Sequence, residues 1–241
     1  MSRERLDKVL ANMGYGTRKE VKAITKSGQV TVNSNIIKDS STHVNPYEDE
    51  IIINGEKVNY REFIYIMMHK PPGVISATED KHTETVIDIL EYEDAVFKPA
   101  PVGRLDKDTE GLLLITNDGE LNHKLLSPKK HVPKKYYADI EGEVTESDIA
   151  EFSKGIILDD GYHTMPAELT ILESGEESKI EVVIYEGKYH QVKRMFEAVG
   201  KKVVYLKRLE MGPLVLDEDL ELGQYRELTD EEVESLFNYT K

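Results

Sequence analysis

The sequence predicts an α+β fold with a small N-terminal domain over residues 1–60 and a larger domain over residues 63–241. Short apolar strands and amphipathic helices alternate along the chain without the strict strand–helix–strand rhythm of a doubly wound sheet. The chain has 241 residues, 39% of them hydrophobic, which is enough to bury two cores. There is no nucleotide-binding glycine motif and no internal repeat.

The N-terminal domain begins with two predicted helices. Apolar side chains recur at helical spacing over residues 6–13, and Gly14 can end this first helix. Residues 17–20 read Thr-Arg-Lys-Glu, which is the spacing of a capping box, and predict a second helix that runs to about Lys26.

Strands follow the two helices. Gln29–Asn33 alternates between apolar and polar side chains, as in a half-buried strand. Asn54-Gly55 separates two further short strands, and both turn residues tolerate a positive φ, which predicts a β-hairpin.

The second domain mixes the two kinds of element. We expect strands over residues 64–68, 112–115, 136–140, 168–172, 179–185 and 202–206, and helices over residues 83–90, 120–126, 144–152 and 187–199. A second capping box, Thr229 to Glu232, predicts a C-terminal helix that buries Val233, Leu236 and Phe237.

One turn concentrates ionisable side chains. Gly103 and Gly111 bracket a segment that contains Arg104 and Asp106, and a buried strand follows it. A loop anchored in the core in this way can position a carboxylate. A solvated, salt-bridged turn explains the spacing equally well, because charged residues are mostly exposed.

Composition excludes several classes of protein. The chain has no cysteine, so it has no disulfide, thiolate metal site or cysteine nucleophile. The N-terminus is not a signal peptide, and no run approaches the roughly 20 apolar residues of a membrane span. We therefore expect a cytoplasmic protein without a membrane partner.

Charge is unevenly distributed along the chain. The net charge is −15, yet residues 1–45 carry twice as many basic as acidic side chains, and residues 122–137 carry five lysines and no acid. The acidic residues concentrate near the C-terminus. This asymmetry suggests a basic face that meets a polyanion.

The first 60 residues resemble the S-four-type RNA-binding domain. The resemblance rests on Arg5–Leu10, Gly16–Glu20 and Gly28–Asn33, and this family usually has glycine where the chain has Ser34. Its two helices present basic residues to structured RNA. The residues that this implies as RNA contacts are Arg5, Lys8, Arg18, Lys19 and Lys22.

Further motifs resemble pseudouridine synthases of the RsuA branch, which join an S-four-type domain to a catalytic domain on a mixed, largely antiparallel sheet. The matching segments are Lys70–Ser76, Gly103–Leu112, Thr116–Gly119, Lys134–Tyr136 and Glu186–Phe196. These motifs follow one another in the family's order, and the resemblance extends to residue 228.

The resemblance implies specific roles. Asp106 is the essential carboxylate, Tyr136 the tyrosine that stacks on uracil, and Lys193 the basic partner that is often Arg in this family. Residues implied as contacts of the substrate are Arg104, Leu206, His190, Gln191 and Arg194. Moving uracil from N1 to C5 involves no redox change or net hydrolysis, so no cofactor or metal is expected. Whether the carboxylate attacks C1′ or removes a ribose proton stays open.

The expected substrate is ribosomal RNA, with the 16S rRNA of the small subunit favoured by the segment Tyr189–Met195. A partly assembled small subunit is a possible partner, and a monomer is expected. One alternative is a synthase for the 23S rRNA of the large subunit. Another is a non-catalytic ribosome-assembly protein, and a third is a glycoside hydrolase that pairs Asp106 with Asp108 or Glu110.

Overall fold

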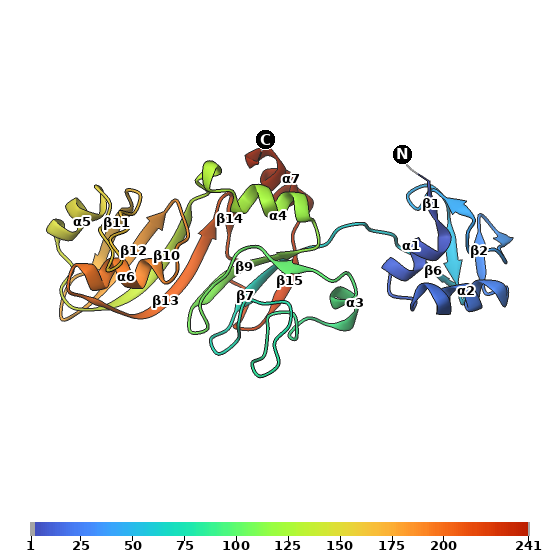
Figure 1. Ribbon diagram of the computed structural model, residues 1–241, viewed down its shortest axis with the longest axis horizontal. Helices are drawn as coiled ribbons and strands as arrows, with labels where there is room; N and C mark the ends of the chain where they lie inside the picture. Colours follow the sequence, from blue (N-terminus) through green and yellow to red (C-terminus); the bar gives the residue numbers. More distant parts are fainter. Residues whose placement is uncertain (1–2, 241) are drawn as a thin grey trace. The chain divides into compact units, whose positions relative to one another are not determined.

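The computed structural model describes residues 3–240, which divide into two compact units (Figure 1). Unit 1 contains the described residues up to Ile64 together with Leu90–Pro99, and unit 2 contains Tyr65–Ile89 and the described residues from Ala100 onward. Within unit 1, the Arg61 guanidinium lies 4.8 Å from the ring centroid of Phe97 and ion-pairs with Asp94 at 3.2 Å. None of the helices in residues 3–240 has the length and apolar character needed to cross a membrane.

Unit 1 contains both predicted N-terminal helices. Helix α1 spans Leu6–Asn12 and helix α2 spans Arg18–Lys26, while α3, Tyr92–Ala95, lies in the returning segment. The capping box at the start of α2 is confirmed. The Thr17 hydroxyl accepts the Glu20 N–H at 3.3 Å, and the Glu20 carboxylate accepts the Thr17 N–H at 2.7 Å.

A four-stranded antiparallel sheet completes unit 1. Its order is β3 (Asn35–Ile36), β2 (Val30–Val32), β5 (Ile51–Ile53) and β6 (Glu56–Lys57), and β1 (Glu4–Arg5) pairs separately with β4 (His43–Val44). The predicted hairpin is confirmed, because Asn54 and Gly55 join β5 to β6 with φ values of 54° and 86°. Apolar side chains of α1, α2, β2 and β5 form the core of the unit.

The turn between β2 and β3 keeps the backbone conformation that glycine favours. Asn33 and Ser34 both have positive φ, 51° and 65°. Because a side chain in this region costs about 1–2 kcal/mol, Ser34 is a strained substitute for the glycine of the related domains. The Asn33 side chain compensates locally by bonding to Asp49 at 2.8 Å and to the N–H of Glu50 at 2.9 Å.

Within the residues that the structure describes, unit 2 is built on a mixed sheet of nine strands in which only β13 and β9 pair in parallel. The path runs β11 (Glu168–Glu173), β12 (Glu177–Ile184), β10 (Lys134–Glu141), β13 (Lys202–Met211), β9 (Glu110–Thr116), β7 (Tyr65–Lys70) and β15 (Tyr225–Glu227). Strand β8 (Ala100–Pro101) adds to β9, and β14 (Leu214–Val215) adds to β13. The expected α+β fold with a largely antiparallel sheet is confirmed.

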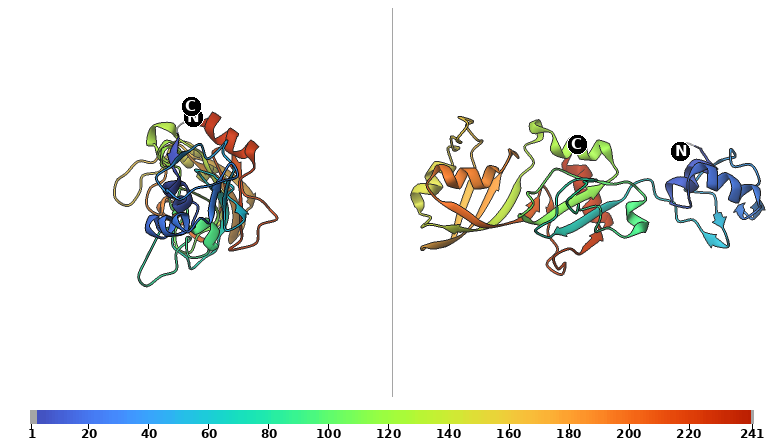
Figure 2. Two further views of the ribbon diagram at one scale, coloured as in Figure 1. Left: turned by 90° about the vertical axis from the view of Figure 1, so that its right-hand side faces the viewer. Right: turned by 60° about the horizontal axis from the view of Figure 1, so that its bottom comes forward.

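Helices pack against both ends of this sheet (Figures 1 and 2). Helices α4 (Gly119–Leu126) and α7 (Asp230–Tyr239) share a core with β7, β9 and β14. At the other end, α5 (Glu146–Phe152) and α6 (Gln191–Ala198) meet through Phe152 and Phe196, whose ring centroids are 4.9 Å apart. A short 3₁₀ helix, η1 (Pro128–Lys130), connects α4 to β10.

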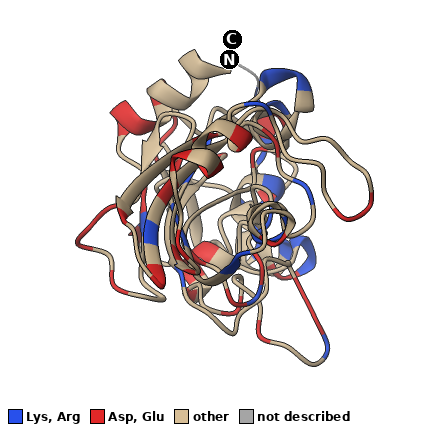
Figure 3. Ribbon diagram, turned by 90° about the vertical axis from the view of Figure 1, so that its left-hand side faces the viewer, with Lys and Arg blue, Asp and Glu red and all other residues tan. Residues whose placement is uncertain are grey.

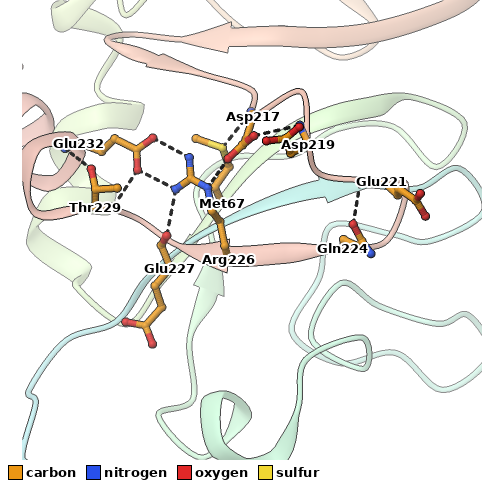
Figure 4. A network of polar contacts seen from close by, with 9 residues as sticks. All are labelled: Met67, Asp217, Asp219, Glu221, Gln224, Arg226, Glu227, Thr229 and Glu232. Carbon is orange, nitrogen blue, oxygen red and sulfur yellow. Dashed lines mark hydrogen bonds and ion pairs between the residues drawn. The ribbon is translucent and has the colours of Figure 1, made fainter.

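Arg226 connects the C-terminal helix α7 to the sheet through hydrogen bonds (Figure 4). From β15, its guanidinium donates to Asp217 at 2.5 Å and to both oxygens of Glu232 at 2.8 and 2.9 Å. Glu232 also accepts the N–H of Thr229 at 2.8 Å, which confirms the second predicted capping box.

Two predictions about unit 2 are wrong. Residues 83–90 form turns rather than a helix, because the Glu84 carbonyl and the Val86 N–H are both bonded to the backbone of Ile75 at 3.0 Å, in a β-bridge that a helix cannot make. Phe237 is exposed rather than buried with Leu236, and its ring meets that of Tyr65 edge to face at 6.0 Å.

Candidate active site

The turn that carries Asp106 is held by hydrogen bonds from the segment after β7. The Ser76 hydroxyl contacts both backbone groups of Leu105 at 3.0 Å, accepting from its N–H and donating to its carbonyl. The Gly73 N–H donates to the Lys107 carbonyl at 2.7 Å. The backbone on both sides of Asp106 is therefore fixed by residues about 30 positions earlier in the chain.

Lys70, at the end of β7, stabilises the C-terminal end of the turn that carries Asp106. Its side chain is fully buried, and its ammonium donates to the carbonyls of Thr109 and Pro71, each at 3.0 Å. Burial lowers the pKa of Lys70 to about 8. Gly111 follows with a φ of 106°, and a Cβ there would lie 2.2 Å from the Arg208 carbonyl, so only glycine permits this approach of β9 to β13.

Asp106 lies beside Lys193 of α6 and His190 of the loop before it. The Lys193 ammonium lies 3.1 Å from one oxygen of Asp106 and 2.6 Å from Asp108, and His190 Nε2 lies 3.6 Å from the other Asp106 oxygen. Burial works to lower the pKa of Lys193, but its bonds to Asp108 and Asp106 outweigh this and raise it. The bond from Lys193 lowers the pKa of Asp108.

A cavity of about 370 Å³ opens beside this ion pair. Six of the residues that the resemblance implies line it: Arg104, Asp106, Tyr136, His190, Gln191 and Leu206. Tyr136 comes from β10 and Leu206 from β13, and both are buried. The antiparallel pairing of these strands places Leu206 opposite Ala138, two residues along from Tyr136. The sheet thus brings residues that are distant in the sequence together in one wall of the cavity.

Gln191 and Arg194 organise loops around the cavity. The Gln191 amide is buried, accepts the N–H of Lys188 at 2.9 Å and donates to Glu186 at 3.0 Å. Arg194 is turned toward Asp160, with which it ion-pairs at 2.7 Å, and it also pairs with Asp159. Of the implied residues of unit 2, Lys193 and Arg194 are therefore the two that lie outside the cavity wall.

The basic residues expected to contact RNA in unit 1 fall into two groups. Arg5 and Arg18 both donate to Asp7, at 2.8 and 2.9 Å, and Lys8 pairs with Glu4 at 2.9 Å. Lys19 and Lys22 are exposed on α2.

Several residues of the site were not assigned a role from the sequence. Lys70 and Ser76 lie within a recognised motif, but only their contacts identify them as supports of the turn. Tyr205 donates to Glu110 at 2.7 Å across the parallel step of the sheet. Lys134 and Arg208 line the cavity, and no local spacing connects them. Across residues 3–240, no group of three or more His, Asp or Glu side chains is placed to hold a metal ion.

Comparison with protein families accounts for both units. Residues 64–198 match the family described as RNA pseudouridylate synthase, and residues 4–51 match the S4 domain. The first match covers the whole turn around Asp106 together with Tyr136 and Lys193. The S4 match covers α1, α2 and the strands through Ile51.

Individual relatives match along nearly their whole length. An uncharacterized RNA pseudouridine synthase, YtzG, of Bacillus subtilis is 54% identical over 96% of this chain and 98% of its own. Ribosomal small subunit pseudouridine synthase A of Vibrio cholerae is 40% identical, covering 97% and 99% of the two chains. Ribosomal large subunit pseudouridine synthase B of Bacillus subtilis is also 40% identical, covering 97% and 95%.

A solved structure leads to the same family. A crystal structure of a pseudouridylate synthase has 39% sequence identity and a TM-score of 0.68, and the match covers 96% of this chain and 99% of the other. Its sequence identity is high enough to support more than a shared fold. The chain therefore belongs to the RNA pseudouridine synthases, in the RsuA-type branch that carries an N-terminal S4 domain.

Proposed function

We propose that this enzyme isomerises one uridine of ribosomal RNA to pseudouridine, with Asp106 as the essential carboxylate. The observation that carries the proposal is the ion pair of Asp106 with Lys193 beside a cavity lined by Tyr136 and Leu206. The Lys193 ammonium holds one oxygen of this carboxylate in place at 3.1 Å. The partly exposed side chain of Asp106 leaves it accessible to a ribose.

The other residues of the site support a base-flipping reaction. A uridine inside folded RNA must leave its stack, which costs a few kcal/mol. Arg104 is exposed at the cavity and can fill the space that the base leaves, because a planar guanidinium stacks on neighbouring bases. Tyr136 stacks on the flipped uracil, Leu206 packs beside it, and His190 contacts the ribose or its phosphate. Gln191 and Arg194 hold the surrounding loops.

We favour 16S rRNA as the substrate. The supporting observation is the segment Tyr189–Met195, which resembles the small-subunit enzymes. Large-subunit rRNA is the second candidate, because the relative named large subunit synthase B is as similar as the small-subunit relative from Vibrio cholerae. Figure 3 marks the acidic and basic residues along the ribbon. Charge does not choose between the two RNAs, because both present the same phosphate backbone.

We further propose that residues 1–60 act as the RNA-binding domain, through Arg5, Lys8, Arg18, Lys19 and Lys22, and that residues 63–241 carry the chemistry. Exposed lysines and arginines lower the free energy of an RNA complex by releasing counterions from phosphates. The enzyme would work as a monomer in the cytoplasm, on free rRNA or on a partly assembled small subunit.

Pseudouridine mapping of rRNA from cells with and without this protein tests the substrate. We expect one site to disappear from 16S rRNA when the protein is absent and to return when it is restored. Loss of a 23S site instead would transfer the assignment to the large subunit. An unchanged map of both RNAs would refute the proposed function.

Tyr136→Phe tests the role of the tyrosine hydroxyl. Phenylalanine keeps the aromatic face, so RNA affinity should change little while single-turnover formation of pseudouridine slows. A variant as fast as the parent enzyme would limit Tyr136 to stacking.

A further inference from the structure

Two cations in the cavity have no part in the roles described so far. Lys134 begins β10, and Arg208 lies on the neighbouring strand β13, where it is the register partner of Tyr136. Both side chains line the cavity together with Tyr136 and Leu206. The pairing of β10 with β13 therefore brings two positive charges beside the tyrosine proposed to stack on uracil.

Neither cation has a carboxylate partner within residues 3–240. Arg208 is 2% exposed, and its Nε donates to the Leu112 carbonyl at 2.8 Å. Its Nη2 is buried and makes no hydrogen bond to any described residue. The Lys134 ammonium donates to the Val132 carbonyl at 2.8 Å, which uses one of its three donors.

The acids nearby are already engaged. The Glu186 carboxylate accepts the Tyr162 hydroxyl at 2.6 Å, the Met165 N–H at 2.8 Å and the Gln191 amide at 3.0 Å. Asp106 is paired with Lys193. Burying cations without counter-ions costs folding free energy, and such an arrangement is typical of a site that receives negative charge.

We propose that Lys134 and Arg208 stabilise the negative charge that forms on uracil when its glycosidic bond breaks, an inference that rests on the proposed function. As C1′–N1 breaks, its electron pair goes to the base and spreads over N1 and the two carbonyl oxygens, O2 and O4. When C5 then bonds to C1′, the hydrogen on C5 leaves as a proton and N1 takes up a proton. No atom or electron is gained or lost, and donors already in place stabilise the charge without reorganisation.

The titration of Lys134 supports this role. Burial, followed by the charge of Arg208, lowers the pKa of Lys134 to about 8, and Glu186 opposes the shift. The other titratable or charged groups around the cavity are Arg104, Asp106, His131, Tyr136, Tyr162, Tyr185, Lys188 and His190. Since the protonated form carries the charge, activity should fall as the pH rises through about 8.

Single-turnover kinetics at saturating enzyme, on a 16S rRNA transcript and on a 23S rRNA transcript, test the proposal. Lys134→Met should slow pseudouridine formation on the order of 10²-fold, as removal of one oxyanion-hole donor does, with RNA affinity unchanged within about twofold. Lys134→Arg should restore most of the rate. Lys179→Met is the matched control, because Lys179 lies on the adjacent strand β12, outside the cavity, and pairs with Glu173.

The pH profile separates Lys134 from Lys70, whose pKa is also lowered to about 8. Lys134→Arg should remove the fall in rate near pH 8, because arginine stays protonated above pH 12. If the fall persists in this variant, Lys70 or another group causes it, and the proposal is wrong.

Two further results would overturn the proposal. Weaker RNA binding by Lys134→Met, with a salt slope lower by roughly 0.7–0.9 and a normal saturated rate, would make Lys134 a phosphate contact. A Lys134→Met variant as fast as the active parent would refute this inference alone. A parent enzyme that modifies neither transcript would refute the proposed function and this inference with it.

Discussion

Asp7 in unit 1 and Asp106 in unit 2 are both carboxylates paired with basic side chains, yet their oxygens differ in how accessible they are to a ligand. Asp7 is buried and receives Arg5 through two bonds, 3.1 and 2.8 Å long, and Arg18 at 2.9 Å. Both of its oxygens accept hydrogen bonds within the fold. Asp106 is 27% exposed and shares one lysine with Asp108.

The two ion pairs leave their carboxylates accessible to different degrees. The bond from Arg5 is the largest of several effects that lower the pKa of Asp7 to about 2. That carboxylate joins the start of α1 to α2 and offers nothing to a ligand. Asp106 is oriented by Lys193, while the turn itself is held through backbone groups, so its oxygens remain accessible from the cavity.

The largest expected effect comes from Asp106→Asn. The change is nearly isosteric but removes the charge, so turnover should fall on the order of 10⁴-fold while RNA affinity stays nearly intact. Single-turnover assays with a parallel binding titration measure both quantities. A variant that retains a tenth of the normal rate would show that Asp106 is not the catalytic group.

Asp7→Asn should lower stability and leave the rate of pseudouridine formation unchanged. Arg5 and Arg18 lose their shared partner, but both are partly exposed and regain solvent, so we expect the free energy of unfolding of unit 1 to fall by about 1–2 kcal/mol. Hydrogen exchange of the α1 and α2 amides measures this loss. The saturated rate of pseudouridine formation should be unchanged, and a large drop in that rate would give Asp7 a role in the chemistry.

Acid should erase the stability difference between the parent and Asp7→Asn. The folded-state pKa of Asp7 is about 2, below its ordinary value of 3.8, so its stabilising effect is present above pH 3.8 and is lost as the pH falls through 2. The effect should amount to about 1–2 kcal/mol after solvent screening. Denaturant unfolding of both proteins across this pH range is the measurement, and a constant difference would contradict the assignment.

The smallest expected effect concerns the salt dependence of RNA binding, to which the exposed lysines of α2 should contribute. Lys19→Gln combined with Lys22→Gln should lower the slope of log affinity against log salt by roughly 1.4–1.8 if each lysine contacts a phosphate. Lys154→Gln combined with Lys179→Gln, which changes charge equally on unit 2, should leave the slope unchanged. Equal slopes in both double variants would remove Lys19 and Lys22 from the RNA interface.

The sequence predicted features whose cause is local. Thr17 and Thr229 start their helices through hydrogen bonds within four residues, and Asn54-Gly55 needs only its own backbone preference. The helix expected over residues 83–90 is absent for a reason that is not local, because backbone groups of Glu84 and Val86 bond to Ile75 instead of to each other's helical neighbours.

The arrangement of the candidate site depends on contacts between residues far apart in the sequence, and the spacing of those residues does not predict them. Asp106 and Lys193 are 87 residues apart, and only resemblance to a family indicated that they meet. Lys134 and Arg208 come together through the pairing of β10 with β13, which is a property of the whole sheet. Phe237 has helical spacing with Leu236 and Val233, but the position of α7 on the sheet leaves its ring outside.

The return of Leu90–Pro99 to unit 1 limits how freely the N-terminal unit can be exchanged between relatives. Part of that unit is encoded within the sequence of the catalytic unit, and Phe97 and Asp94 there contact Arg61. A chimaera that exchanges only residues 1–60 would place a foreign surface against native α3. Grafts between members of this family should therefore transfer residues 90–99 together with the first 64 residues, because both segments belong to unit 1.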